Sequence, residues 1–327
     1  MPRIVVTGGA GYVGSVLTGH LLMSGWSVVV VDALAGGGES LLGFASHPMF
    51  RLVAGDVRDS TRLDEACEGA QAVIHLAAVV GEGACAGDAD NSRAINLGGT
   101  MGVLDAAERR GVERFIFIST CSNYGVSDRD ALATEESPLH PLGVYAQSKV
   151  DAERAVLDFK GKMSTAVLRL GTICGLSVAM RFDLLVNDMA RAAALGDSIQ
   201  IFAPEAWRPF LHVRDASRAI EHCLGAPAAT IAGRVFNVVG ENFQKKELVE
   251  LVHRHYPAAS ISLEHAIPDA RDYRVSGARF AAELGFRSLH TVEAAFLEMA
   301  GAVQAGMFRD PRWARHAAAP PTFFAVP

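Results

Sequence analysis

A glycine-rich turn near the amino terminus constrains the fold of this chain more than any other feature. The apolar segment 3–6 leads into residues 7–14 (TGGAGYVG), and a helical pattern follows to residue 23. Gly8 allows a tight turn, Gly11 lets the backbone approach a ligand closely, and Gly14 lets the helix pack on the strand. The first turn of such a helix presents free N–H groups that attract phosphate. This arrangement predicts an α/β fold that binds a nucleotide.

The first half of the chain alternates short β-branched segments with longer helical patterns, which is typical of a parallel sheet covered on both faces. Residues 28–31 are four consecutive valines, as expected for a strand buried on both sides. We therefore predict a Rossmann-type, doubly wound parallel sheet. The expected strands are 3–6, 27–31, 50–53, 72–76, 114–118 and 166–170, and the expected helices are 12–23, 60–68, 95–110 and 144–159.

The second half is less regular because prolines interrupt it at positions 204, 209, 227 and 257. Helices are expected at 184–194, 216–224 and 246–255, with Asp215 capping the second of them. We interpret residues 1–173, with a return segment near 211–240, as a dinucleotide-binding domain. Residues 174–309 are expected to form a smaller mixed α/β substrate-binding domain, and 310–327 a loosely ordered tail.

Composition excludes several functions. The net charge of −6 comes from 36 acidic and 30 basic residues without a basic cluster, which argues against a nucleic-acid partner. The five cysteines are scattered without a CxxC pair, so we expect neither disulfides nor a metal site. The chain opens directly on an apolar strand, and the apolar stretch 72–80 is too short to span a bilayer. We expect a cytoplasmic protein without a membrane partner.

An acidic residue ends the second expected strand. The carboxylate of Asp32 can accept hydrogen bonds from a ribose diol and would repel a 2′-phosphate. No arginine follows within the next six residues. The sequence therefore predicts NAD, rather than NADP, as the cofactor.

Two residues four apart in an expected helix carry candidate catalytic groups. Tyr145 and Lys149 project from one face of that helix. A free tyrosine titrates at about 10, which makes it a poor base at neutral pH. A neighbouring ammonium favours the phenolate, so we predict that Lys149 lowers the pKa of Tyr145. Thr120 follows Ser119 at the end of the fifth strand, where ligands bind in such sheets. We predict that Thr120, Tyr145 and Lys149 act together on a substrate hydroxyl.

These motifs resemble those of the extended short-chain dehydrogenase/reductases that act on nucleotide sugars. Similar segments occur at 73–78 (VIHLAA), 96–100 (NLGGT), 145–149 (YAQSK), 208–215 (RPFLHVRD), 235–238 (VFNV) and 271–273 (RDY), so the resemblance covers about residues 3–305. It implies a homodimer formed through the helices 95–110 and 144–159, and a structural rather than catalytic His75. The expected cofactor contacts are Gly8, Gly11, Tyr12, Val13, Gly14, Asp32, Asp56, Val57, Leu76, Ala77, Ala78, Asn96, Ser119, Tyr145 and Lys149.

The resemblance also implies a nucleoside-diphosphate sugar as substrate. Arg208 and Arg271 match the phosphate-contacting arginines of the family, with Arg274 as a rival for the second role, and Asn187 matches its diphosphate-loop asparagine. Arg181 lies in a segment that departs from the family pattern and is an additional candidate for an anion contact. The expected substrate contacts are Thr120, Cys121, Ser122, Arg181, Asn187, Arg208 and Arg271.

The residues after Thr120 discriminate between reactions. The nucleotide-sugar 4,6-dehydratases that this chain resembles need an Asp-Glu pair there, whereas this chain has Cys121 and Ser122. Related reductase-epimerases use NADPH and a Cys/His pair, for which Cys121 and His140 are weak candidates. We therefore expect a 4-epimerase resembling UDP-galactose 4-epimerase. A dehydratase, a dehydrogenase, a reductase and a catalytically silent NAD-binding protein remain alternatives.

Overall fold

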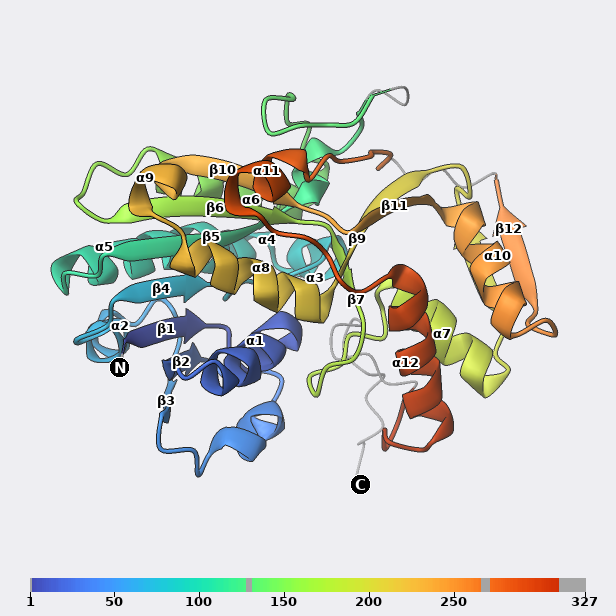
Figure 1. Ribbon diagram of the computed structural model, residues 1–327, viewed down its shortest axis with the longest axis horizontal. Helices are drawn as coiled ribbons and strands as arrows, with labels where there is room; N and C mark the ends of the chain where they lie inside the picture. The colour runs from blue at the N-terminus through green and yellow to red at the C-terminus, as the bar shows by residue number, and fades with distance from the viewer. Residues whose placement is uncertain (1, 128–130, 266–270, 312–327) are drawn as a thin grey trace.

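A seven-stranded parallel sheet forms the centre of the molecule (Figure 1). The computed structural model describes residues 2–127, 131–265 and 271–311, so nearly all of the predicted tail, 312–327, lies outside it. The strand order is β10-β6-β5-β4-β1-β2-β3. The bounds are β1 (Arg3–Thr7), β2 (Ser27–Asp32), β3 (Phe50–Ala54), β4 (Ala72–His75), β5 (Arg114–Thr120), β6 (Ser164–Leu170) and β10 (Arg234–Val238). The predicted Rossmann-type sheet is confirmed.

Alternate residues of these strands face two different helical layers. On one face, Val6 and Val30 lie in a core that includes Leu17 of α1 (Tyr12–Met23) and Ile220 of α8 (Val213–Gly225). On the other face, the core contains Val5, Val29 and Val73 of the sheet. Their partners come from the helices α2 (Ser60–Cys67), α5 (Thr100–Arg109) and α6 (Gly143–Leu157). Burial on both sides explains why the strand sequences are almost wholly apolar.

The helix expected at 95–110 differs from the prediction. Residues Ala94–Gly99 form a π-helical turn, and α5 begins only at Thr100. The turn carries Asn96 into the interior, where its amide bonds to the backbone of Val79 in both directions, at 2.8 and 3.0 Å. A Cβ at Gly99 would lie 2.6 Å from a methyl group of Val57, so this segment packs more closely than a side chain would allow. Such turns recur at functional sites.

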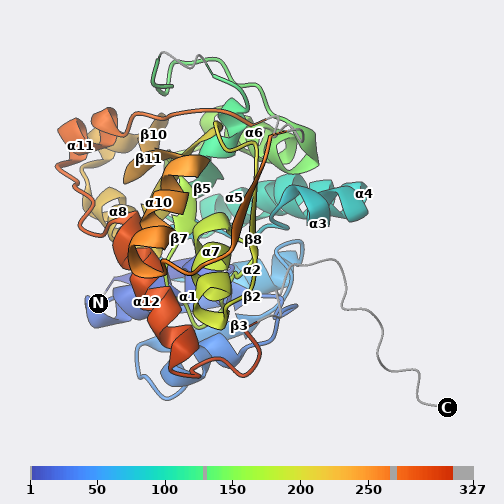
Figure 2. The ribbon, with the colours of Figure 1, turned by 90° about the vertical axis from the view of Figure 1, so that its right-hand side faces the viewer.

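A second group of elements follows β6 along the chain. A small sheet has the order β11-β9-β7, formed by β7 (Thr172–Cys174), β9 (Trp207–His212) and β11 (Glu241–Gln244). The strands β8 (Ile199–Phe202) and β12 (Ile261–Glu264) pair in parallel. Figure 2 faces this group, with its helices α7 (Leu185–Leu195), α10 (Lys245–His255) and α12 (Val292–Gln304). Met189 of α7 and Phe296 of α12 are buried in the core that holds it together.

The helix expected at 216–224 begins earlier, and the prediction that Asp215 caps it is wrong. α8 starts at Val213 because the ring of His212 accepts the backbone N–H of Arg214 at 3.1 Å. The carboxylate of Asp215 points elsewhere and accepts hydrogen bonds from the Ser288 hydroxyl and the backbone of His290. Burial alone would raise the pKa of Asp215, but these bonds outweigh it and lower that pKa to about 2. Asp215 therefore links α8 to the segment before α12.

Several other properties of the described residues bear on function. All five cysteines are buried and free. No group of three or more His, Cys, Asp and Glu side chains within the described ranges could hold a metal ion. In the same ranges, no helix has the length and apolar character needed to cross a membrane.

Candidate active site

A cavity of about 980 Å³ opens at the carboxyl ends of the central strands. Its wall combines the ends of β1, β2, β4 and β5 with residues of β7, β8 and β9. The strand order reverses between β1 and β4, and ligands bind at this point in doubly wound sheets. The cavity is thus extensive enough to hold both a dinucleotide and a second ligand.

The glycine turn forms one end of the cavity. Gly8 adopts a φ of +76°, and a Cβ at Gly14 would collide with the carbonyl oxygen of Gly8, so neither position accepts a side chain without distortion. Asp32 accepts hydrogen bonds from the backbone N–H groups of Ala10 at 2.9 Å and Leu34 at 2.8 Å. This fixed carboxylate beside an open helix N-terminus fits the ribose and pyrophosphate of NAD.

Most of the predicted cofactor contacts line this cavity. The structure brings together Gly8, Gly11, Tyr12, Val13, Gly14, Asp32, Asp56, Val57, Leu76, Ala77, Ala78, Ser119, Tyr145 and Lys149. Asp56 also pairs with Arg58 at 2.7 Å, which holds the pKa of its carboxyl below the usual range. Asn96 does not line the cavity, because it is buried behind Val79 and also bonds to Ser148 at 2.9 Å.

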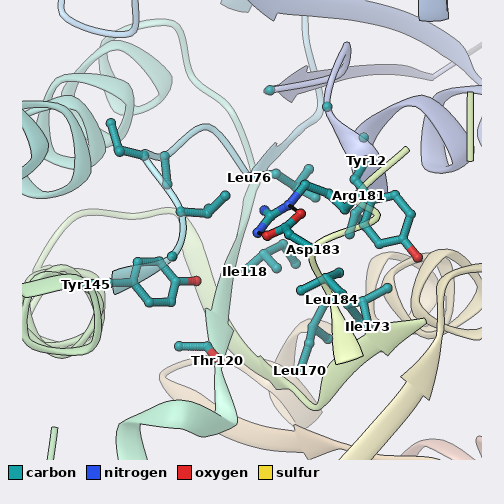
Figure 3. A pocket seen from close by; sticks show the side chains of 18 of the residues that line it. Tyr12, Leu76, Ile118, Thr120, Tyr145, Leu170, Ile173, Arg181, Asp183 and Leu184 are labelled. Carbon is teal, nitrogen blue, oxygen red and sulfur yellow. Dashed lines mark hydrogen bonds and ion pairs between the residues drawn. The ribbon is translucent and has the colours of Figure 1, made fainter. Parts of the chain in front are cut away.

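Thr120 and Tyr145 both line the cavity (Figure 3). The hydroxyl of Thr120 is hydrogen-bonded to that of Ser122 at 2.8 Å and lies close enough to the phenol of Tyr145 to lower its pKa. Burial raises the pKa of Tyr145 strongly, and the cation that acts against this effect is Arg181. Without a ligand, the phenol is therefore protonated at neutral pH.

Lys149 lies one helical turn from Tyr145 along α6. Its Nζ lies 4.1 Å from the centre of the Phe117 ring. Burial lowers the pKa of Lys149 to about 7, although the carboxylate of Glu153 acts in the opposite direction, so the amine is only partly protonated at neutral pH. The cation that counteracts the rise in the Tyr145 pKa is Arg181. That Lys149 also lowers this pKa stays a prediction.

A buried polar network supports this end of β5 from behind. Ser119 donates to Glu153 at 2.9 Å, and Arg169 donates from Nε to both oxygens of the same carboxylate at 3.1 Å. Arg169 also donates to the hydroxyl of Tyr124 at 2.9 Å. Because every partner is buried, the network fixes the strand that carries Thr120.

Several cationic side chains line another part of the cavity wall. Arg181 forms two bonds of 2.6 Å with Asp183, and both side chains line the cavity (Figure 3). Arg208 and Arg271 also line it, and Nη1 of Arg208 donates to the carbonyl of Arg271 at 2.5 Å. Arg274, the rival of Arg271, lies over the Trp207 ring at 4.8 Å instead. Guanidinium groups suit the oxygens of a diphosphate.

Two predicted substrate contacts lie away from the cavity. The thiol of Cys121 is buried and directed to the carbonyl of Arg169, while Ser122 does line the wall. The side chain of Asn187 is also fully buried, and its amide bonds to Gly175 at 3.0 Å and to the phenol of Tyr12 at 3.0 Å. Its polar atoms are thus occupied in joining α7 to α1. Both assignments are corrected for this structure.

Several polar residues of the cavity were missed by sequence reasoning, among them Glu82, Asp183 and Lys245. Nζ of Lys245 donates to the carbonyl of Phe202 at 2.9 Å. Lys245 begins α10, far along the chain from the glycine turn, so no local motif signals its position. Glu82 follows Gly81 in a stretch without recognisable spacing. Only the Arg181–Asp183 pair had a sequence signal, as neighbouring opposite charges.

The glycine turn, the fixed ribose acid and the Thr120–Tyr145–Lys149 group together define an NAD-linked enzyme of the extended short-chain dehydrogenase/reductase class. Comparison with known proteins gives the narrower assignment. A model of the NAD dependent epimerase/dehydratase family matches residues 4–239, and the chain belongs to that family.

Characterised relatives include enzymes of both kinds. The chain is 32% identical over 302 residues to a dTDP-glucose 4,6-dehydratase of Streptomyces griseus, covering 87% of this chain and 88% of the relative. It is 29% identical over 278 residues to a UDP-glucose 4-epimerase of Rhizobium meliloti, covering 77% and 81%. The fold matches a UDP-glucuronic acid 4-epimerase of Bacillus cereus, with a TM-score of 0.84 at 21% identity over 93% of this chain and 99% of that one. Sequence relatives therefore leave open which of the two reactions this chain catalyses.

Proposed function

We propose that this enzyme is a nucleotide-sugar 4-epimerase that works through a transient 4-keto sugar. The observation that carries the proposal is that Thr120 and Tyr145 line one cavity while the residues that follow Thr120 are Cys121 and Ser122. Elimination of water across C5 and C6 needs an acid and a base beside Thr120 and Tyr145. The buried thiol of Cys121, with its pKa raised well above the usual range by burial, supplies neither.

The carboxylates on the cavity wall near Tyr145 do not replace the missing pair. Glu82 accepts two backbone N–H groups of the Tyr145 helix, and Asp183 is bonded twice by Arg181. Both are therefore engaged as hydrogen-bond acceptors. Neither Cys121 nor His140 lines the part of the cavity that the structure describes, so a Cys/His mechanism has no support from geometry.

The chain's own residues have distinct tasks in epimerisation. NAD+, when held by the glycine turn and Asp32, would supply a reversible acceptor for the C4 hydride. Tyr145 removes the proton of the C4 hydroxyl and Thr120 orients that oxygen. Arg181, together with the protonated fraction of Lys149, contributes positive charge near the phenolate. Arg208 and Arg271 hold the diphosphate while the 4-keto sugar turns. The proton on Tyr145 then returns to the sugar oxygen, so that no net oxidation and no loss of water occur.

A product analysis tests this proposal. The purified protein, with its bound dinucleotide, is incubated with UDP-glucose, UDP-galactose, UDP-glucuronic acid and dTDP-glucose in D2O. We expect one of these sugars to change only its C4 configuration, with unchanged mass and without deuterium on carbon, because the hydride returns within the site. Loss of 18 mass units with deuterium uptake would establish a dehydratase instead. A lasting rise in NADH absorbance would establish a net dehydrogenase, and no turnover of any sugar would favour the silent binder.

A further inference from the structure

The Tyr145 helix receives its N-terminal cap from a residue far away in the sequence. Glu82, at the start of α3 (Glu82–Gly87), accepts the backbone N–H of Tyr145 at 3.2 Å and that of Ala146 at 3.1 Å. Both N–H groups lie in the first turn of α6 (Gly143–Leu157), where no carbonyl of the helix is available to accept them. A carboxylate is favoured there by the helix dipole.

The local sequence of α6 provides no substitute for this cap. Leu142 stands at the N-cap position, and no side-chain cap is formed there. Gly143 adopts a φ of +89°, and a Cβ at this position would collide with the carboxylate of Glu82. The backbone at the start of α6 is therefore shaped around Glu82.

Glu82 and Arg181 both line the catalytic cavity. Nη2 of Arg181 lies 3.8 Å from the position that a Cβ of Gly81, the neighbour of Glu82, would take. Figure 3 shows Tyr145 on one side and Arg181 with Asp183 on the other. The cavity that holds the phenol of Tyr145 thus contains an anion bound to the backbone of the Tyr145 helix and a cation paired with Asp183.

Other groups also surround the phenol, among them Asp183, which forms two hydrogen bonds with Arg181. Cys85 of α3 carries a thiol whose pKa is raised by burial, so it is uncharged at neutral pH. Thr120 of β5 contributes a neutral hydroxyl, and Lys149 of α6 has its pKa lowered to about 7 by burial. Burial dominates the raised pKa of Tyr145, with Arg181 acting against it and Glu82 adding to it.

We propose that Glu82 is a positioning residue that anchors the first turn of α6 and whose charge acts on the Tyr145 phenol in the sense opposite to that of Arg181. Through the two backbone bonds it fixes where the phenol stands relative to Thr120. Through its charge it adds to the effect of burial, which keeps the phenol protonated. The inference concerns Tyr145 and rests on its proposed role as base, but its test needs no turnover.

Titration of the phenolate tests the proposal. Near-ultraviolet phenolate absorbance is followed after rapid pH jumps in NAD+-saturated protein, and the signal of the matching Tyr145→Phe protein is subtracted, because the chain has five tyrosines. We expect Glu82→Gln to lower the Tyr145 midpoint, and Arg181→Gln to raise it, each by about one pH unit. Glu82→Asp, which keeps the charge but shortens the reach, should leave the midpoint within a few tenths of the wild-type value.

A solvent-exposed carboxylate on the neighbouring helix α4 (Ala89–Arg93) provides the control. Asp90→Asn removes one negative charge without touching the cavity and should not move the midpoint. A purely structural role for Glu82 would disturb folding, read from unfolding curves and NAD content, without opposite shifts in the two variants. An unchanged midpoint in Glu82→Gln, or shifts in the same direction in both variants, overturns the proposal. If Glu82→Gln does not fold, a midpoint that fails to rise in Arg181→Gln overturns it.

Discussion

At the scale of single residues, the chemistry of this enzyme depends on groups whose pKa values burial shifts. Burial raises the pKa of Tyr145, which keeps the phenol neutral, and lowers that of Lys149 to about 7, so that the amine is only partly protonated at neutral pH. A neutral pair costs less to bury than a charged one without partners. The positively charged nicotinamide of the oxidised cofactor then favours the phenolate only when the complex is assembled.

Replacing Tyr145 tests its role as the base. Tyr145→Phe should reduce kcat by about 10²–10⁴-fold, because the proton of the C4 hydroxyl loses its acceptor. NAD content and thermal stability should change little, since the ring is retained. Tyr256→Phe, outside the cavity, serves as the matched control. Full activity of Tyr145→Phe in the product assay would remove Tyr145 from the mechanism.

A buried histidine should make stability depend on pH. His75 is 1% exposed, bonds to the hydroxyls of Thr7 at 2.6 Å and Thr100 at 2.9 Å, and has its pKa lowered to about 3 by burial. The folded protein keeps it neutral while the unfolded chain protonates it below about 6.5. Its contribution is therefore present above that pH and is lost as pH falls towards 3.

This effect can be measured by denaturant unfolding at two pH values. The decrease in the free energy of unfolding from pH 7.5 to pH 5 should be about 2 kcal/mol smaller in His75→Gln than in the wild type. The exposed His47 provides the control, and His47→Gln should behave like the wild type. Identical pH dependence in His75→Gln and the wild type would show that the imidazole is not held neutral.

At the scale of secondary-structure elements, the junction between β1 and α1 sets the cofactor site. The backbone of Gly14 approaches that of Gly8 so closely that no side chain fits between them. The helix can therefore begin directly against the strand, which aims its first N–H groups at the cavity. The glycines at this junction are needed for the close approach rather than for flexibility, since α1 is a regular helix from Tyr12 onwards.

An added methyl group at this junction should abolish cofactor retention. In Gly14→Ala the new Cβ meets the backbone oxygen of Gly8, which cannot move aside cheaply, so we expect NAD affinity to fall by at least about tenfold. Gly301→Ala in α12, where no atom lies within 4 Å of the added Cβ, is the matched helical control. Equal NAD content of the two purified variants would contradict this account.

At the scale of the whole molecule, two helices on one face of the sheet remain available for assembly. α5 and α6 pack beside each other, and Met101 on α5 is 50% exposed. The family resemblance leads us to propose that two copies join through these helices. Such an interface would bury the back of α5, which follows the turn that carries Asn96, and the back of α6, which carries Tyr145, and so would stiffen the site.

A charge on this face should separate the copies. Met101→Glu is expected to convert a dimer into a monomer in sedimentation velocity, because a buried unpaired carboxylate is costly. Met23→Glu, at the exposed end of α1 on the opposite face of the sheet, is the control and should leave the mass unchanged. A monomeric wild type, or a dimer that survives Met101→Glu, would contradict the proposed interface.

The sequence by itself determined the central sheet and the cofactor class, and it supplied the candidate catalytic residues. These depend on local signals: the apolar run of each strand, the glycine spacing, the acid that ends β2 and the four-residue spacing of Tyr145 and Lys149. Each of them acts within one element and its neighbour, so a linear pattern is enough to reveal them.

Only the tertiary structure decided which polar groups face the cavity. The side chains of Asn187 and Cys121 could bind a substrate but form hydrogen bonds with buried partners instead. Glu82 and Lys245, in contrast, line the cavity although they come from distant parts of the chain. Likewise, the sequence assigned the charge acting on Tyr145 to Lys149, but packing put Lys149 over Phe117 and brought Arg181 to the cavity. Burial and long-range contacts set these outcomes, because the electrostatic effect of a charge depends on its solvation and its distance, neither of which is written in local spacing.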